Sequence, residues 1–129
     1  MLLKGGTLVQ LYPPSIARAD LRIDGDVIVA RGARLAPKGG EPVEDCRGRI
    51  ILPGFVCAHT HTYSALSRGM PAPGRPPASF PDMLRRVWWR LDESLTDETI
   101  YYSAMVAAVD AVTAGTTTLF DHHASPAAI

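Results

Sequence analysis

The sequence predicts an α/β protein in which a small β region over residues 1–52 precedes one βαβ unit over residues 53–129. In the first part, short apolar segments alternate with turn residues, which is typical of strands joined by tight turns. In the second part, two short apolar segments flank one long helical pattern. That order is typical of two parallel strands with a crossover helix.

Composition and charge exclude several classes of function. The chain has 129 residues, of which 47% are hydrophobic and 20% charged, and its formal net charge is zero. This balance gives no electrostatic reason to expect binding to nucleic acid or to an anionic membrane. No segment approaches the roughly 18 apolar residues of a membrane span, and the N-terminus lacks the features of a signal peptide. We therefore expect a cytoplasmic protein with two reduced thiols, Cys46 and Cys57.

The β region contains several strand patterns. Pro13 and Pro14 end the first pattern, because proline has no backbone N–H to give to a sheet. Asp24-Gly25 suits a two-residue hairpin turn between two apolar segments, so antiparallel pairing is expected here. Strands are predicted over residues 8–11, 21–23, 27–29 and 49–52.

The second part begins after Pro53-Gly54. Residues 55–59 are a short apolar segment, which fits a strand buried on both faces of a parallel sheet. Residues 70–81 are rich in proline and glycine and indicate a loop, and residues 82–92 fit a short helix. Residues 116–120 are β-branched and then apolar, which predicts the second strand.

A longer helix is predicted over residues 96–114. Thr96 is a suitable N-cap, two acidic residues follow it, and Gly115 ends the helix. An apolar stripe recurs at helical spacing on the expected buried face, formed by Met105, Ala108, Val109 and Val112.

His59 and His61 are the strongest candidates for chemistry. Alternate residues of a strand point to the same face, so both imidazoles should project together from the end of the first buried strand. Two neutral imidazoles on one face can share a divalent ion, and ligands of parallel α/β folds bind at the carboxyl ends of strands. The structural alternative is a pair of hydrogen-bonded histidines that bind no ligand.

Context favours the metal interpretation. Residues 48–61 read GRIILPGFVCAHTH, and this run closely resembles the signature of the amidohydrolase superfamily. The segments IDGDVIVA (residues 23–30) and GTTT (residues 115–118) are also similar to family segments, and they occur in the family's order. The resemblance implies part of a small β-sandwich over residues 1–52. It also implies the first βαβ unit of an incomplete (β/α)8 TIM-type barrel over residues 53–129.

The segments SALSRGM (residues 64–70), WWRLD (88–92) and DHHASP (121–126) resemble the deaminase and chlorohydrolase branch, and among it the SsnA-type aminohydrolases. The resemblance implies a metal-dependent hydrolase of non-peptide carbon–nitrogen bonds, which deaminates a purine-like or other N-heterocyclic small molecule. It implies one divalent ion, zinc or alternatively iron, held in part by His59 and His61. A homo-oligomer of the complete protein stays open.

The same resemblance implies that the remaining ligands and the catalytic carboxylates lie on later strands. The sequence ends at Ile129, so we expect a fragment that carries half of a metal site, no catalytic residue, and no activity by itself. Whether the truncation is biological or reflects a partial gene model stays open.

Four further residues are candidates for substrate binding. His122 and His123 follow the second strand, and strand alternation allows at most one of them to face the site. The resemblance places Asp92 where related nucleoside deaminases carry an acidic ribose contact, although that residue is usually Glu. Trp88 could form a wall of a pocket for a flat heterocycle, as could Trp89. The alternatives are solvated or structurally bonded histidines, a solvated carboxylate and simple packing.

Three other residues have stronger structural explanations. Arg68 could bind an anionic substrate, but a salt bridge is the favoured role. Cys57 could be a third metal ligand, yet the resemblance places a barrel-core residue there. Asp45 resembles a structural aspartate of the family's sandwich.

Two other functions compete with the hydrolase. One is a non-catalytic remnant that binds a metal or a partner through Cys57, His59, His61 and the His122-His123 pair. The other is a β-sandwich binding module with a coincidental His-x-His. Coding sequence beyond residue 129 would separate the first from the enzyme, since an enzyme needs later histidines and a late aspartate.

Overall fold

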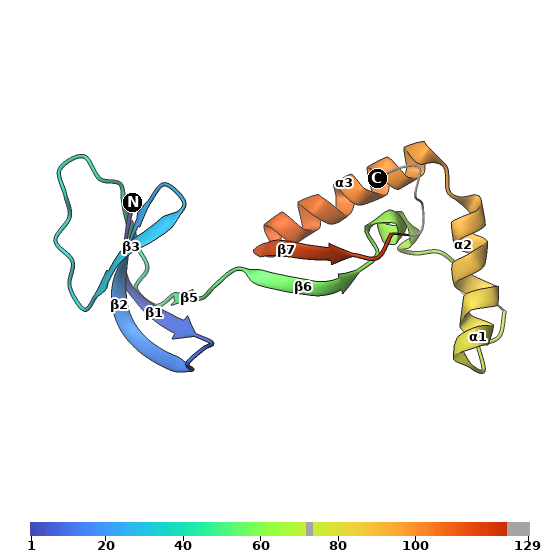
Figure 1. The fold of residues 1–129 in the computed structure, drawn as a ribbon, viewed down its shortest axis with the longest axis horizontal. Coiled ribbons are helices and arrows are strands. Elements are labelled where there is room, and N and C mark those ends of the chain that lie inside the picture. Colours follow the sequence, from blue (N-terminus) through green and yellow to red (C-terminus); the bar gives the residue numbers. More distant parts are fainter. Residues whose placement is uncertain (72–73, 124–129) are drawn as a thin grey trace. The chain divides into compact units, whose positions relative to one another are not determined.

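The computed structural model describes residues 1–71 and 74–123. The chain divides into two compact units, and the second begins at Gly54. The predicted α/β class is confirmed, because the first unit is a β-sheet and the second combines strands with helices (Figure 1). Both described cysteines are free thiols, with Cys46 buried and Cys57 half-buried. No helix in the described ranges has the length and apolar character needed to cross a membrane.

The first unit is built on strand β1. It contains β1 (Leu2–Gln10), β2 (Ser15–Asp24), β3 (Val27–Gly32), β4 (Val43–Asp45) and β5 (Ile50–Ile51). β1 pairs antiparallel with β2, which pairs antiparallel with β3. β4 and β5 both pair with β1 in parallel. The expected antiparallel pairing therefore holds for β1, β2 and β3 but not for β4 and β5, because after β3 the chain crosses back and runs along β1 in the same direction.

The β2–β3 hairpin turns one residue later than predicted. Asp24 pairs with Val27, so the loop consists of Gly25 and Asp26. Gly25 has a φ of 59°, a left-handed conformation that tight hairpin turns require and that glycine adopts without steric cost. The position of the glycine thus determines where the hairpin turns.

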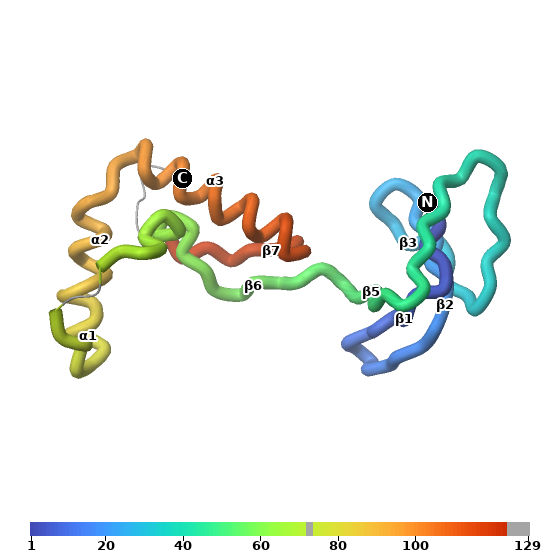
Figure 2. The backbone as a smooth tube through the Cα atoms, turned by 180° about the vertical axis from the view of Figure 1, so that it is seen from behind, coloured from blue at the N-terminus to red at the C-terminus, as the bar shows by residue number. Residues whose placement is uncertain are grey.

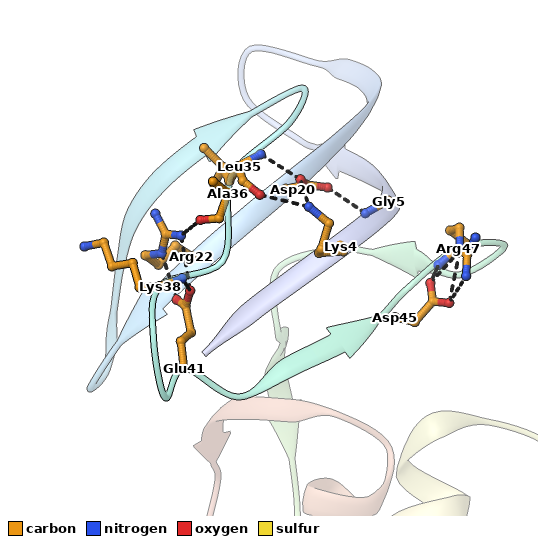
Figure 3. Close-up of polar contacts among 10 residues, drawn as sticks. All are labelled: Lys4, Gly5, Asp20, Arg22, Leu35, Ala36, Lys38, Glu41, Asp45 and Arg47. Carbon is orange, nitrogen blue, oxygen red and sulfur yellow. Dashed lines mark hydrogen bonds and ion pairs between the residues drawn. The ribbon is translucent and has the colours of Figure 1, made fainter.

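A buried carboxylate organises the polar side of this sheet. Asp20 accepts hydrogen bonds from the backbone N–H of Leu35 at 2.9 Å, from Lys4 Nζ at 2.9 Å and from the N–H of Gly5 at 2.7 Å (Figure 3). The Leu35 bond, followed by those from Lys4 and Gly5, lowers the pKa of Asp20 to about 2. Asp20 therefore fastens the loop after β3 to the sheet. The small apolar core of the unit is formed by Leu8, Ala19 and Leu21, with Leu3 and Ile51 against it.

The second unit contains the predicted βαβ arrangement. Strands β6 (Phe55–Thr60) and β7 (Thr116–Asp121) pair in parallel, and helix α3 (Asp97–Thr113) precedes β7. Both ribbon and tube views show α3 running alongside β7 (Figures 1 and 2).

A helical excursion separates β6 from α3. It begins with the 3-10 turn η1 (Thr62–Ser67) and continues, after a loop, with α1 (Phe80–Met83), the π-helical turn η2 (Leu84–Trp88) and α2 (Trp89–Ser94). The helix predicted over residues 82–92 is therefore present but longer and interrupted by a π turn. Such turns add a residue to the helical ladder and shift the direction of the side chains that follow.

Helix α3 has the predicted ends. Thr96 is the N-cap, and its hydroxyl accepts from the N–H of Thr99 at 3.2 Å while the Thr99 hydroxyl accepts from the N–H of Thr96 at 2.8 Å. This reciprocal pair is a capping box, with threonine in the position usually held by glutamate or glutamine. Gly115 follows the helix with a φ of 76°.

The apolar stripe of α3 is exposed in the described part of the chain. Val109 is 58% exposed and Val112 is 74% exposed, and Met105 and Ala108 are exposed as well. The covered face instead carries Ile100 and the fully buried Ser103. Small side chains on this face allow α3 to approach η1 closely. The face that packs is therefore the one that can approach and form hydrogen bonds, and it is not the face with the largest apolar residues.

The prediction that β6 is buried on both faces is wrong for the described residues. Phe55 is 56% exposed and Val56 is 61% exposed. Two strands with one helix packed against β7 leave much of the sheet uncovered in the described part of the chain.

Candidate metal centre

The two histidines of the His-x-His motif converge at the carboxyl end of β6. His59 is the penultimate residue of the strand and His61 follows its end. Their Nε2 atoms lie 3.1 Å apart. Two nitrogens bound to one tetrahedral zinc ion at the usual bond lengths lie about 3.3 Å apart. The separation fits a shared divalent ion, and it also fits the alternative, a hydrogen bond between the two rings.

An irregularity in the strand pairing lies at this point. Cys57 pairs with Leu119 and Thr60 pairs with Asp121, so β6 has one more residue than β7 between the two pairs. Such a bulge bends a strand and redirects side chains, and bulges occur often beside active sites. The extra residue falls where the chain carries Ala58 and His59.

A backbone carbonyl sets the tautomer of His61. Its Nδ1 lies 2.8 Å from the carbonyl oxygen of His122. A carbonyl can only accept, so in the neutral ring the proton is assigned to Nδ1 and the lone pair is on Nε2. This is the usual arrangement of a metal-ligating histidine, in which the second nitrogen donates to a carbonyl or carboxylate.

His122 also contacts the other histidine of the pair. Its ring stacks on that of His59 with centroids 4.2 Å apart and 24° between planes. Its backbone N–H donates to the carbonyl oxygen of Thr60 at 2.9 Å. His122 thus closes one side of the pair with its ring while its backbone joins the ends of β6 and β7.

Asp121 anchors the residue that follows His61. The N–H of Thr62 donates to Asp121 Oδ1 at 3.0 Å, and the Thr62 hydroxyl donates to Oδ2 at 2.5 Å. His123 Nδ1 donates to Oδ2 at 3.0 Å. Burial favours the protonated carboxyl, but the hydrogen bonds from Thr62 and His123 outweigh it and lower the pKa of Asp121.

Aromatic rings surround the pair. Tyr63 is 5% exposed, and its ring makes edge contacts with His61, at a centroid distance of 5.7 Å, and with His123, at 5.5 Å. The ring of Trp88 lies 5.9 Å from that of His61. Trp89 is half exposed, so the two neighbouring tryptophans have different environments.

Two buried polar atoms beside this cluster have no hydrogen-bond partner among the described residues. They are Asp92 Oδ1 and His123 Nε2. Because His123 donates through Nδ1, its Nε2 is an acceptor in the neutral ring, as is the Asp92 oxygen. Burial, followed by the nearby Asp92 carboxylate, raises the pKa of the Tyr63 hydroxyl.

The structure therefore brings five of the predicted candidates together: His59, His61, His122, His123 and Trp88. Asp92 joins them through its proximity to Tyr63. Sequence reasoning did not identify Asp121, Thr62 and Tyr63 as site residues. All three residues lie within two positions of His61 or His122 in the sequence. This proximity was a usable signal, because the neighbours of a ligand often hold it in place.

The other polar candidates have different partners. Arg68 forms an ion pair with Asp110 on α3, which is the structural alternative. The Cys57 thiol donates to the carbonyl oxygen of His59 at 3.3 Å. Asp45 is paired with Arg47 in the first unit (Figure 3).

Within residues 1–71 and 74–123, no group of three or more His, Cys, Asp or Glu side chains is arranged to hold an ion. The described residues thus offer two candidate ligands, His59 and His61, whereas catalytic zinc sites use three protein ligands.

Comparisons with known proteins find a matching family and several similar proteins. Residues 50–129 match the Amidohydrolase family. The chain is 31% identical over 121 residues to the 5-methylthioadenosine/S-adenosylhomocysteine deaminase of Thermococcus sibiricus, covering 94% of this chain and 27% of that protein. It is 33% identical over 104 residues to the 5'-deoxyadenosine deaminase of Methanobrevibacter smithii, covering 81% of this chain and 23% of that protein.

A solved structure is similar as well. The atrazine chlorohydrolase TrzN from Arthrobacter aurescens TC1, complexed with zinc, superimposes with a TM-score of 0.77 at 30% identity. The match covers 95% of this chain and 28% of that one. The chain thus spans about a quarter of the length of the relatives it matches.

Proposed function

The chain belongs to the amidohydrolase family, and on that premise we propose that it supplies the first two metal ligands of a hydrolase that deaminates an N-heterocycle. The observation that carries the proposal is the approach of His59 Nε2 to His61 Nε2 at 3.1 Å. The hydrogen bond from His61 Nδ1 to the His122 carbonyl supports it, because it leaves Nε2 free to bind.

We further propose that the βαβ unit is the first unit of a (β/α)8 barrel in the complete protein. The parallel pairing of β6 with β7 supports this arrangement. In such barrels the carboxyl ends of the strands form the active-site face, and His59, His61 and His122 all lie there.

The ion proposed for this site is zinc. Imidazole nitrogens are ligands that zinc accepts readily, and the zinc-bound TrzN structure supports the choice over iron. A divalent ion held there would supply the Lewis acidity needed for hydrolysis at an electron-poor ring carbon. His59 and His61 hold the ion, and the ring of His122 shields one side of the pair.

The proposed substrate is an aminated flat heterocycle of the adenine-nucleoside type. The deaminase relatives act on adenosine derivatives by their names, and the ring of Trp88 beside His61 offers a face for stacking. Asp92 Oδ1 and His123 Nε2 are buried acceptors without partners among the described residues. We expect N–H or O–H groups of the substrate, such as an amino group or sugar hydroxyls, to donate hydrogen bonds to these two atoms.

The test begins with metal binding by the intact gene product. Replacing His59 or His61 by Ala should raise the Kd for zinc by more than about 100-fold, above the 10–100-fold typical for loss of a supporting residue. The matched control is His122→Ala, which keeps the carbonyl that contacts His61 and should cost less. Zinc binding unaffected by H59A and H61A would refute the assignment.

Activity is assayed as ammonia release from 5-methylthioadenosine, 5'-deoxyadenosine, guanine and pterin, with chloride release from atrazine as a separate arm. We expect zinc-dependent ammonia release from an adenosine derivative, which H59A abolishes. Chloride release without ammonia release would reassign the substrate class. Zinc binding with turnover of no compound would favour a non-catalytic metal-binding module.

A further inference from the structure

The carboxylate of Asp121 joins the two halves of the histidine cluster. It accepts from the amide and hydroxyl of Thr62, the residue after His61, and from the ring of His123, the residue after His122. Asp121 belongs to β7, whereas Thr62 follows the end of β6. One side chain therefore fixes the residues next to both members of the His61–His122 hydrogen bond.

This anchoring occurs beside an irregularity of the strand ladder. The bulge between Cys57 and Thr60 disrupts the regular pairing of β6 with β7 just before the strands end. A side chain that holds both chain ends replaces the ladder hydrogen bonds that the bulge removes. The Thr62 contact is short, at 2.5 Å to Oδ2, as expected for a hydroxyl that donates to an ionised carboxylate.

We propose that Asp121 is a positioning residue for the metal site, and this rests on the function proposed above. By holding Thr62 and His123, it keeps the His122 carbonyl 2.8 Å from Nδ1 of His61. That contact keeps the proton on Nδ1 and directs the lone pair of Nε2 toward the shared point with His59. Asp121 touches neither the ion nor the substrate in this assignment.

Two variants of the intact protein separate positioning from general support of the fold. Asp121→Asn keeps one acceptor oxygen but puts a donor amide against the Thr62 hydroxyl and His123. Thr62→Val retains the side-chain shape and removes only the hydroxyl contact. Asp110→Asn is the matched control, because Asp110 is an exposed aspartate in the same unit whose partner is Arg68 on the surface.

The first readout is the tautomer of His61 in the metal-free protein. Long-range 1H–15N spectra near pH 8, well above the ordinary imidazole pKa of about 6.5, distinguish Nδ1–H from Nε2–H rings. His61→Ala identifies the resonance. We expect the Nδ1–H form in the wild type and in D110N, and a mixture of tautomers in D121N and, to a smaller extent, in T62V.

The second readout is the Kd for Co2+, measured from the visible absorption of the bound ion. D121N should raise this Kd by about 10–100-fold, the range typical when the partner of a ligating histidine is lost. T62V should raise it less, and D110N should leave it unchanged.

An unchanged His61 tautomer and a Kd within twofold of the wild type in both D121N and T62V would overturn the proposal. If D121N does not fold, T62V decides by the same criteria. If the wild type binds no Co2+, the proposed function fails while the tautomer measurement still tests the positioning role.

Discussion

The hydroxyl of Ser103 donates a hydrogen bond of 3.0 Å to the carbonyl oxygen of Thr62. Ser103 is fully buried on α3, and its oxygen also accepts from the N–H of Leu66 at 3.1 Å. This single side chain attaches α3 to the turn that follows His61. The helix thus supports the histidine pair through a polar contact.

Ser103→Ala should therefore destabilise the protein by about 1–3 kcal/mol, because it leaves a buried carbonyl and a buried N–H without their partner. Urea unfolding followed by circular dichroism measures the change. Ser94→Ala is the control, since that hydroxyl is exposed and, among the described residues, bonds only within its own helix, to the Leu91 carbonyl. Equal stability of S103A and S94A would contradict the assigned role.

Trp88→Ala should weaken substrate binding while Trp89→Ala should not. An aromatic pair contributes about 0.5–1.5 kcal/mol beyond its buried area, so KM should rise by about 2–12-fold in W88A. The two residues are adjacent, but only the ring of Trp88 lies beside His61, and Trp89 is half exposed. Steady-state kinetics with the best substrate tests this. An equal KM in W88A and W89A would show that Trp88 does not line the substrate pocket.

Asp20 should make the stability of the first unit depend on acid pH. Its pKa is lowered from 3.8 to about 2 in the folded state, so its contribution is complete above pH 3.8 and is lost as the pH falls through 2. The melting temperature of Asp20→Asn should be lower than that of the wild type at pH 6, and the two should converge toward pH 2.

The control for this pH series is Asp26→Asn in the exposed β2–β3 turn, which should follow the wild type throughout. A constant difference between D20N and the wild type from pH 6 to pH 2 would contradict the ionic role of Asp20.

Gly54→Ala should destabilise the second unit. A Cβ atom at Gly54 would collide with the side chain of Thr117 at the start of the β6–β7 pair. Overpacking of this kind costs about 1–3 kcal/mol. Gly39→Ala is the matched control, because a Cβ there meets no atom within 4 Å. Urea unfolding compares them, and a G54A protein as stable as G39A would show that β7 shifts freely.

The sequence predicted the features that depend on neighbouring residues. The ends of α3 followed from Thr96 and Gly115, and the parallel pairing of β6 with β7 followed from the order of two apolar segments around one long helical pattern. The His59–His61 spacing indicated a shared direction because strand geometry is local. These inferences need only a few consecutive residues.

Features that depend on distant residues could not be predicted in this way. Thr62 and Asp121 are far apart in the chain, and nothing in either segment specifies the partner. The covered face of α3 was missed because the larger apolar residues of the helix lie on its other side. Ser103 is on the covered face because it forms a hydrogen bond with η1. The parallel pairing of β4 with β1 likewise requires knowing how the long loop returns.

The parallel pairing of β1 has a consequence for synthesis. Leu2 pairs with Val43, and Thr7 pairs with Ile50. The second edge of β1 is therefore covered only after these later residues have been synthesised. The β1–β2–β3 meander can form as soon as Gly32 has left the ribosome, and its open edge then remains available for wrong pairing. At about 5–20 residues per second, translation from residue 32 to residue 51 takes about 1–4 s. The rate of elongation through this stretch therefore sets how long the nascent sheet is exposed to aggregation.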